Sequence, residues 1–401
     1  MLALRLTRAA RPAVQLRRLL VAAASAGTGF LLLSCLGYAL NRPEAADAAA
    51  LRLAWCTLPL AATVYLALAV ARTDPGTRPR PGLSAVGLGP ARLMAISALT
   101  TALSCTLGSA LALLFFLHLR GDLTGMPFDG AAADVLATGV PLPLPATATL
   151  LAVLPATATT AVAVALRPKD PRPRPAAEPH PTGSGTAGAD GDETAPNGEP
   201  DAQPPAPDSG VRTPVGLPWG VALVAAGLTA HAYAGRSAPA PALPVLLGWL
   251  LTATGLVVAS PGLTHLCGLL LQACRPGALR LLAGRVLMTE AARIGRPLGV
   301  VSAVASAGYA MTAVYDDPAA AFGPLAALGA LVVAGSTVAT LLTVAVEARQ
   351  CRAGTTAALL RLGAPAGTLR VAAALRAAAL LALFAPLTLV IAALSALPLT
   401  R

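Results

Sequence analysis

Long runs of apolar residues recur along the chain, separated by short polar segments rich in arginine, glycine and proline. A run of about 18 or more apolar residues is long enough for a helix to cross a membrane. Nine such runs predict spanning helices, at approximately 19–40, 51–71, 93–119, 143–166, 217–234, 243–271, 297–315, 321–346 and 371–397. This pattern predicts an all-α fold, a polytopic transmembrane helix bundle.

The composition agrees with a membrane environment. Hydrophobic residues make up 56% of the 401 residues and charged residues only 12%, and a soluble chain would carry about twice that charge. A single soluble globular domain is therefore excluded, because so few charges cannot cover so much apolar surface. Lys169 is the single lysine among 29 basic residues, a skew typical of GC-rich bacterial genes.

The basic residues predict how the helices are oriented. If the N-terminus is cytoplasmic, 23 of the 29 basic residues lie inside, in the N-terminal tail and in segments 72–92, 167–216, 272–296 and 347–370. This distribution satisfies the positive-inside rule and predicts a multi-pass protein of the cell (plasma) membrane with a cytoplasmic N-terminus and an outside C-terminus. Because topology accounts for the formal net charge of +11, no nucleic-acid partner is expected.

One segment between the fourth and fifth runs has a different composition. Residues 167–216 are rich in proline and acidic residues and nearly free of large apolar ones. They cannot bury enough apolar surface to offset chain entropy, so they predict a disordered, Pro-rich cytoplasmic linker. The rest of the chain divides into a first membrane unit (1–166, about four spanning helices), a central helix pair (217–271) and a second membrane unit (272–401, about three spanning helices).

The two membrane units resemble each other. The sequence Ala-Ser-Ala-Gly at 24–27 recurs at 305–308, each time after an Arg-rich lead-in, at 4–20 and at 279–297. Both lead-ins predict interfacial amphipathic helices that bind lipid. The common order of these elements indicates two repeated units.

A second pair of matching segments lies in two cytoplasmic turns, at 83–93 and 359–369, each before a long Ala- and Leu-rich run. The sequence Leu-Arg-Leu-Gly-Ala at 360–364, followed by Leu-Arg at 369–370, is similar to a turn of the FtsX-like permease family, L-R-x-L-G-A-x-x-x-x-L-R. The segment 86–93 matches it loosely. That family comprises the membrane subunits of a class of ABC systems.

The resemblance implies an integral membrane, permease-like subunit of an ABC transporter. Such a subunit couples a separate cytoplasmic ATPase to transport or to mechanical signalling across the membrane. The resemblance also implies two FtsX-like units joined by the central helix pair. Two features depart from the family: the outside segments 41–50 and 316–320 are too short for its usual large outside domain, and the second unit is one helix shorter than the first.

In the mechanism that the resemblance implies, the two turns open short helices that dock into grooves on the ATPase. Leucines would supply the apolar anchors, and arginines would meet an acidic rim or anionic lipid. The candidate coupling residues are Leu88, Gly89, Pro90, Arg92, Leu93, Arg361, Leu362, Gly363, Ala364, Pro365, Leu369 and Arg370. The alternative interpretation, ordinary positive-inside loops with a Gly/Pro turn, stays open.

No residues are predicted to catalyse a reaction, bind a cofactor or ligate a metal. A P-loop places its lysine in G-x-x-x-x-G-K-[ST], whereas Lys169 is followed by Asp170. The chain is therefore not expected to be an enzyme, and the ATPase must be a separate polypeptide. Without a C-x-x-C pair, the six cysteines predict buried small hydrophobes rather than a zinc knuckle or a disulfide framework. The histidines predict helix ends or the bundle interior, and they are His118, His180, His231 and His265.

Two classes of function are left open. A permease subunit would have the ATPase, the lipid bilayer and a second copy of the chain as partners. The alternative is a stand-alone membrane bundle, either a non-catalytic scaffold or a secondary transporter whose site lies at helices broken between Pro141 and Pro155. Ion-coupled transporters usually carry intramembrane charges. The apolar runs here carry almost none, and Asp134 and Glu347 predict solvated helix ends.

The predicted topology can be tested with reporter fusions. A fusion after Arg174 should report the cytoplasm and a fusion after Arg401 the exterior, because 23 of the 29 basic residues lie on one side. Enzymatic reporters active on one side of the membrane measure this directly. The opposite result at either position contradicts the map.

Overall fold

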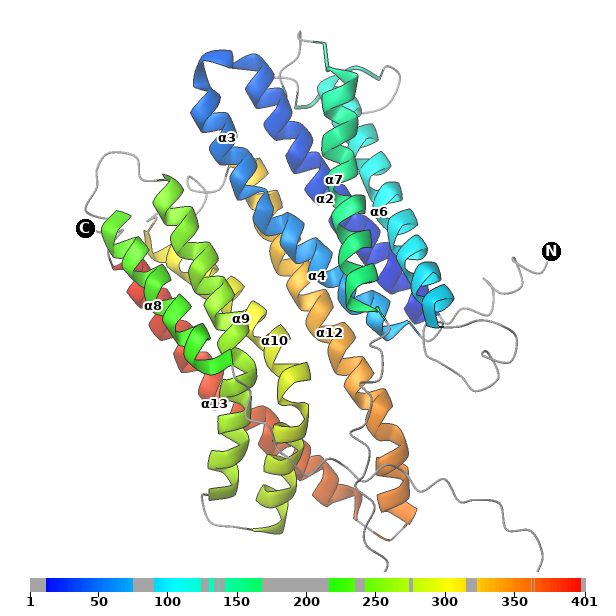
Figure 1. Ribbon diagram of the computed structural model, residues 1–401, viewed down its shortest axis with the longest axis vertical. Coiled ribbons are helices and arrows are strands. Elements are labelled where there is room, and N and C mark those ends of the chain that lie inside the picture. Colours follow the sequence, from blue (N-terminus) through cyan, green and yellow to red (C-terminus); the bar gives the residue numbers. More distant parts are fainter. Residues whose placement is uncertain are drawn as a thin grey trace, which may run out of the picture. The chain divides into compact units, whose positions relative to one another are not determined.

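Helices make up nearly all of the part of the chain that the structure, a computed structural model, describes (Figure 1). The described residues are 12–74, 90–123, 130–132, 136, 141–167, 216–234, 242–273, 277–314, 323–361, 363 and 365–397. Their helices are α2 (Pro12–Asn41), a 3-10 turn (Pro43–Ala45), α3 (Ala46–Trp55), α4 (Thr57–Thr73), α6 (Pro90–Arg120), α7 (Leu144–Ala165), α8 (Gly216–Ala234), α9 (Ala242–Ala273), α10 (Ala278–Val314), α12 (Pro324–Arg361) and α13 (Ala366–Ala396). No strand occurs among these residues, so the predicted all-α fold is confirmed. Of the predicted linker 167–216, all but the two end residues lie outside the described residues.

Proline marks where several helices begin. Pro12, Pro90 and Pro324 are the first residues of α2, α6 and α12. Proline suits this position because its fixed φ is helical and the first amides of a helix have no intrahelical partner. Behind these starts, the Ala- and Leu-rich sequence consists of strong helix formers. Local sequence therefore determines both where these helices begin and that they continue.

Eight of the helices in the described residues are long and apolar enough to cross a membrane. They account for eight of the nine predicted runs. The remaining run, 297–315, forms the second part of α10, whose first part carries the Arg-rich lead-in. Figure 1 shows the long helices from α2 to α13, α10 included, running in alternating directions. The chain is therefore a multi-pass membrane protein.

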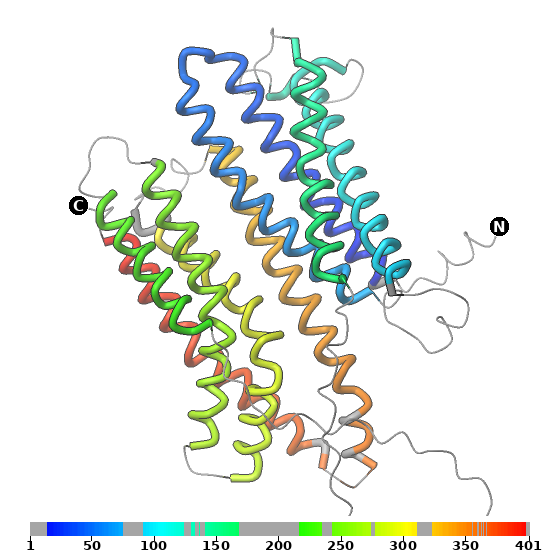
Figure 2. The backbone as a smooth tube through the Cα atoms, in the orientation of Figure 1, coloured from blue at the N-terminus to red at the C-terminus, as the bar shows by residue number. Residues whose placement is uncertain are grey.

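The two predicted membrane units pack their helices in the same order. In the first unit, α2 packs more extensively against α6 than against α4; in the second, α10 packs more extensively against α13 than against α12. The helices that follow the two matching turns, α6 and α13, are each 31 residues long. The units meet where α4 lies beside α12 (Figures 1 and 2). A recurrent packing order is what an internal repeat produces.

Hydroxyl groups join the helices of the first unit at membrane depth. The Ser25 hydroxyl of α2 donates a hydrogen bond to the Cys105 carbonyl of α6 over 2.8 Å. The hydroxyls of Thr28 in α2 and Thr63 in α4 are 3.0 Å apart and share a second bond. All four of these residues are buried. In lipid, where no water competes, such bonds stabilise helix pairs.

Glycine brings α8 and α9 into backbone contact. A Cβ on Gly220 would lie 2.5 Å from the Ala259 backbone nitrogen, and one on Gly227 would lie 2.7 Å from that of Thr252. From the other side, a Cβ on Gly255 would lie 2.6 Å from a backbone nitrogen of α8. Real Cβ atoms do not approach backbone so closely. The two helices can therefore pack this way only with glycine at these positions.

The same close packing continues from α9 to α10. A Cβ on Gly284 would lie 2.7 Å from the Gly268 carbonyl oxygen, and one on Gly295 would lie 2.7 Å from the Cα of Pro261. Both glycines of α10 belong to the lead-in 279–297. This lead-in packs along α9 and runs without interruption into the rest of α10. The prediction of a separate interfacial helix at 279–297 is therefore wrong.

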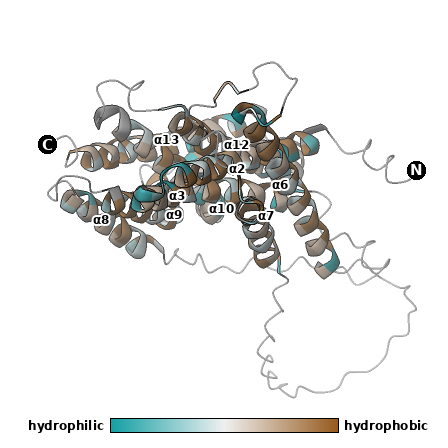
Figure 3. Ribbon diagram, turned by 90° about the horizontal axis from the view of Figure 1, so that it is seen from above, coloured by the Kyte–Doolittle hydropathy of each residue, from teal (hydrophilic) through white to brown (hydrophobic). Residues whose placement is uncertain are grey.

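Large apolar side chains cover the outward faces of the helices. On α6, Leu99, Leu103 and Leu107 follow one another at a spacing of four residues and are each more than half exposed. Residues four apart share one helix face, so this stripe faces away from the bundle. Figure 3 shows hydrophobic residues on outer as well as inner faces of the helices. Such a surface suits lipid rather than water.

We expect the glycine contacts to tolerate no larger side chain. Gly227→Leu should lower the free energy of unfolding by roughly 1–3 kcal/mol or more, because the new side chain forces α8 away from α9. Thermal unfolding of the detergent-purified protein measures this. Gly335→Leu is the matched control, since nothing lies within 4 Å of a Cβ at Gly335 of α12. Equal loss of stability in both variants would contradict the proposed role of close packing.

Candidate functional site

The turn between α12 and α13 projects beyond the membrane-spanning part of the bundle. α12 has 38 residues, about 57 Å at 1.5 Å per residue, whereas the hydrocarbon core is about 30 Å thick. Residues 324–346 of α12 carry no charge, and all its charged residues lie in 347–361. The last turns of α12 therefore extend into the polar region, and the turn lies at their end.

Glycine and proline shape this turn. Gly363 has φ +86°, a left-handed conformation that ends a helix and that only glycine adopts at low cost. Pro365 then caps α13 from an extended conformation, φ −66° and ψ 132°. Of the predicted coupling residues here, Leu362 and Ala364 lie outside the described residues. The chain is thus turned sharply from one long helix into the next.

The side chains around this turn face outward. Arg361, Gly363, Pro365 and Arg370 are exposed, and Leu369 is half-buried. Arg361 is the last residue of α12, where a positive charge complements the negative end of the helix dipole. A half-buried leucine flanked by two exposed arginines can contact an apolar groove with an acidic rim.

The corresponding turn of the first unit differs in one decisive respect. Leu88 and Gly89 lie outside the described residues, α6 begins at Pro90, and Arg92 is exposed. Leu93, however, is only 6% exposed. A leucine buried within its own chain cannot insert into a partner's groove, so the anchor role predicted for Leu93 does not fit. The two turns are similar in sequence, but only the second has its leucine partly exposed.

Two ion pairs tie α10 to α12 close to the turn. The Nε of Arg352 donates to Oε1 of Glu290 over 2.7 Å, and a second guanidinium nitrogen contacts the other carboxylate oxygen. Arg293 pairs with Glu347 one helical turn further along. All four side chains are partly buried, Glu347 among them with 18% exposed. Glu347 is therefore not the solvated helix end that the sequence predicts.

The Cys351 thiol and the Arg376 guanidinium lie close to these two ion pairs and interact with them. Partial burial disfavours the charge on Arg293, but hydrogen bonds from its guanidinium to the Glu347 carboxylate and the Cys351 thiol outweigh burial, so the pKa of Arg293 is raised above its ordinary value. Arg376 of α13 interacts electrostatically with both Arg352 and Glu290. We call Glu290, Arg293, Glu347, Arg352 and Arg376 the ion cluster. It connects α10, α12 and α13.

The first unit has a smaller counterpart of the ion cluster. Arg18 of α2 donates to the Asp74 carboxylate at the end of α4 over 2.8 Å. Next to it, Arg17 donates to the Thr73 hydroxyl over 3.3 Å. In both units, charged side chains therefore join the first helix to the second at the end where the basic residues gather.

These ion pairs were not predicted from the sequence, although the sequence holds a signal for them. Asp74, Glu290 and Glu347 are the single acidic residues in the basic segments 72–92, 272–296 and 347–370. Each of the three is paired with an arginine of another helix. An isolated acidic residue in a basic loop of a helix bundle thus indicates an interhelical ion pair.

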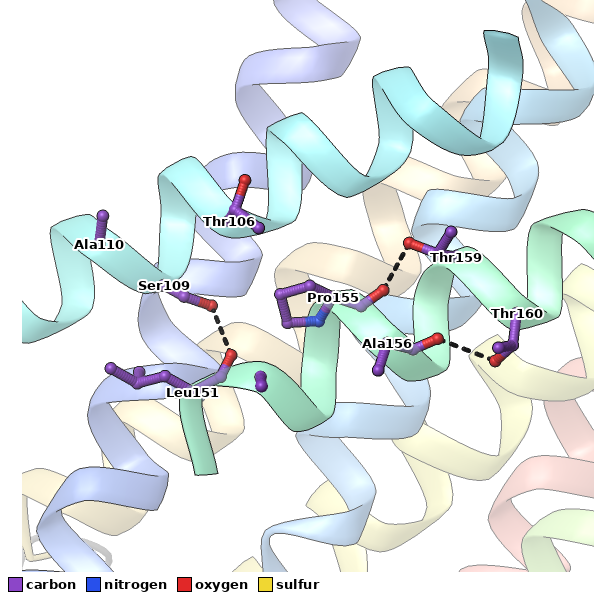
Figure 4. Close-up of a pocket in the computed structure, with 9 residues that line it drawn as sticks. Thr106, Ser109, Ala110, Leu151, Pro155, Ala156, Thr159 and Thr160 are labelled. Atoms are coloured by element: carbon purple, nitrogen blue, oxygen red, sulfur yellow. Dashed lines mark hydrogen bonds between the residues drawn. The ribbon is translucent and has the colours of Figure 1, made fainter. Parts of the chain in front are cut away.

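A shallow groove of about 600 Å³ lies between α6 and α7 (Figure 4). Its lining is small and uncharged: Thr106, Ser109, Ala110, Leu151, Ala152, Pro155, Ala156, Thr159 and Thr160. The Ser109 hydroxyl donates to the Leu151 carbonyl over 3.1 Å, and the Thr159 hydroxyl donates to the Pro155 carbonyl, which already satisfies these polar groups. α7 passes through Pro155 unbroken. The discontinuous helix expected of a transporter site is therefore not found here.

The histidines lie where the sequence predicts them, insofar as they are described. His231 is fully buried in α8, with its Nδ1 2.8 Å from the Gly227 carbonyl and its ring edge-to-face against Trp249. His265 is buried in α9, and His118 lies in the last turn of α6. No group of three or more potential metal ligands occurs in the part of the chain that the structure describes.

Comparison with family models, with curated proteins and with solved structures finds no match to this chain.

The ion cluster makes a prediction about stability. Glu290→Gln and Arg352→Gln should each lower the free energy of unfolding by about 1–2 kcal/mol, between the values for exposed and for buried pairs. The double variant should lose less than the sum of the two single losses, because the residues act as a pair. Thermal unfolding of the four proteins measures this cycle.

Arg349→Gln is the control, since Arg349 is exposed on the same helix. Strictly additive losses from Glu290→Gln and Arg352→Gln would show that the two side chains do not stabilise each other.

Proposed function

We propose that the chain is the non-catalytic membrane subunit of an ABC system, coupled to a separate cytoplasmic ATPase through the turn at 361–370. The observation that carries this proposal is the exposed, sharply bent turn at the end of a 38-residue helix, which is longer than a bilayer is thick. A turn serving only as a connection would not require α12 to continue for about 15 residues past its uncharged part.

The ion cluster supports the proposal by giving the turn a mechanical connection to the bundle. Docking of a partner at Leu369 would act directly on α12 and α13, the two helices that the turn joins. Both are linked to α10 through Glu290, Arg293 and their partners. α10 in turn packs against α9 through glycine. A displacement at the turn would therefore move several spanning helices together and not bend one helix alone.

Orientation follows from the same proposal. The ends of α12 and α13 at the turn, and the start of α6, lie at one end of the helices (Figure 1). The basic residues gather at this end, and by the positive-inside rule it would face the cytoplasm. The start of α2 lies at the same end, and the partner ATPase would reach both turns from there.

The two turns would contribute unequally. Leu369 is available as an anchor, whereas Leu93 is buried. Arg92 and Arg370 are both exposed. The first turn would then contribute charge contacts and the second both charge and apolar contacts, so that the second turn supplies most of the affinity.

The coupling role predicts the effect of a double variant. Gly363→Val with Leu369→Asp should weaken binding of the ATPase by about 2–4 kcal/mol, the usual loss when an apolar anchor is removed. Nothing lies within 4 Å of a Cβ at Gly363, so valine strains only the backbone of the turn. Affinity purification from the native membrane, with quantification of the copurified ATPase, measures the effect.

Leu53→Asp provides the matched control. Leu53 is 42% exposed on α3 and lies at the opposite end of the helices, where no ATPase can bind. It should leave the amount of ATPase unchanged. If the double variant also retained the full amount, or if no ATPase copurified with the parent protein, the stand-alone bundle would replace this proposal.

A further inference from the structure

Two thiols meet where α2 is followed by α3 and α4. The Sγ atoms of Cys35 in α2 and Cys56 at the join of α3 and α4 lie 3.4 Å apart, although the residues are 21 positions apart in sequence. A disulfide bond requires about 2.05 Å between the sulfurs, and the two sulfurs already lie in contact with each other. We propose that Cys35 and Cys56 form an intramolecular disulfide bond. It depends on no ATPase partner.

The surroundings place this pair close to the membrane surface. The Tyr38 ring carries two guanidinium groups, with the Cζ of Arg52 at 3.6 Å and the Cζ of Arg42 at 5.0 Å from its centre. Tyrosine is enriched at the membrane–water interface, and arginine side chains near helix ends extend towards it. Cys35 precedes Tyr38 by three residues and Cys56 follows Arg52 by four, so each thiol lies one helical turn from this stack. The half-buried Cys35 is therefore the thiol of the pair that a reagent from the aqueous side would meet first.

The pair also lies on the side where disulfides persist. It lies near the join of α2 and α3, which Figure 1 shows at the end opposite the turn between α12 and α13, and the distribution of arginines predicts this end to be outside. Compartments outside the cytoplasm are oxidising, whereas cytoplasmic thiols are kept reduced. Two thiols in contact on that side would not stay reduced.

The difference in exposure between the two thiols determines which of them reacts first with an oxidant. The oxidant is the disulfide of a thiol–disulfide oxidoreductase outside the membrane. Cys35 is half-buried and Cys56 only 7% exposed, so the Cys35 thiolate attacks the oxidant and releases one of its sulfurs as a thiol. The Cys56 thiolate then displaces the second sulfur from the mixed disulfide. Cys35 and Cys56 each lose one electron and one proton, and the oxidant leaves as a dithiol.

The bond would fasten a contact between the two membrane units. Cys56 is buried in a cluster with Leu31 and Leu32 of α2, and Leu325 and Leu328 of α12 pack against this cluster. Joining Cys35 to Cys56 fixes the end of the α2–α3 hairpin against which the first turn of α12 packs. The disulfide would thus hold the hairpin in the shape that α12 requires.

Thiol counting on the full chain in its native membrane tests the proposal. Cells are quenched with acid, all free thiols are blocked with N-ethylmaleimide in SDS, and the protein is then reduced and labelled with a polyethylene glycol maleimide. The parent should gain two labels per chain and migrate as a monomer on a non-reducing gel. Cys35→Ser and Cys56→Ser should each gain none.

Cys105→Ser is the matched control, because Cys105 is a buried thiol of α6. It should keep both labels. An unlabelled parent would overturn the proposal. Two labels that persist in Cys35→Ser, or a parent that migrates as a disulfide-linked dimer, would overturn it as well, because the bond would then involve other cysteines or another chain.

Discussion

Backbone contact through glycine is the constraint on which the arrangement of the second half depends. Lipid chains are as apolar as leucine, so burying leucine against leucine does not drive helices together inside a membrane. Dispersion and weak polar contacts must do so, and both require close approach. Gly220, Gly227 and Gly255 provide this between α8 and α9, and Gly284 and Gly295 provide it between α9 and α10. The three helices therefore form one tightly packed block.

Different forces act at different depths of the bundle. Near the middle of the helices, glycine contacts such as that of Gly227 and hydroxyl bonds such as Ser25 to Cys105 hold neighbours together without charge. At the end rich in arginine, where lipid gives way to water, charged pairs are added, Arg18 with Asp74 in the first unit and the ion cluster in the second. Charges so placed avoid the cost of desolvation in hydrocarbon while still fixing the helix ends.

The spanning helices could be predicted from the sequence because each run of apolar residues is a local property. Which helices touch is not local, and there the sequence was less informative. The glycines at 248, 255 and 262 recur at intervals of seven, the pattern of a packing face, but only the structure shows that α8 lies against it. The lead-in 279–297 has the composition of an interfacial helix, and packing along α9 overrides that local preference.

The two turns with similar sequences illustrate the same limit at single residues. Leu93 and Leu369 occupy matching positions in two similar segments, and the segments alone do not show which of the two leucines is buried. Their surroundings do, because Leu93 is buried at the start of a helix that packs along α2 and α7. Leu369 follows a helix that extends about 15 residues beyond its uncharged part, which carries the start of α13 away from the lipid-embedded packing. The length of the neighbouring helix, and not the motif, thus decides which of the two similar turns leaves its leucine partly exposed.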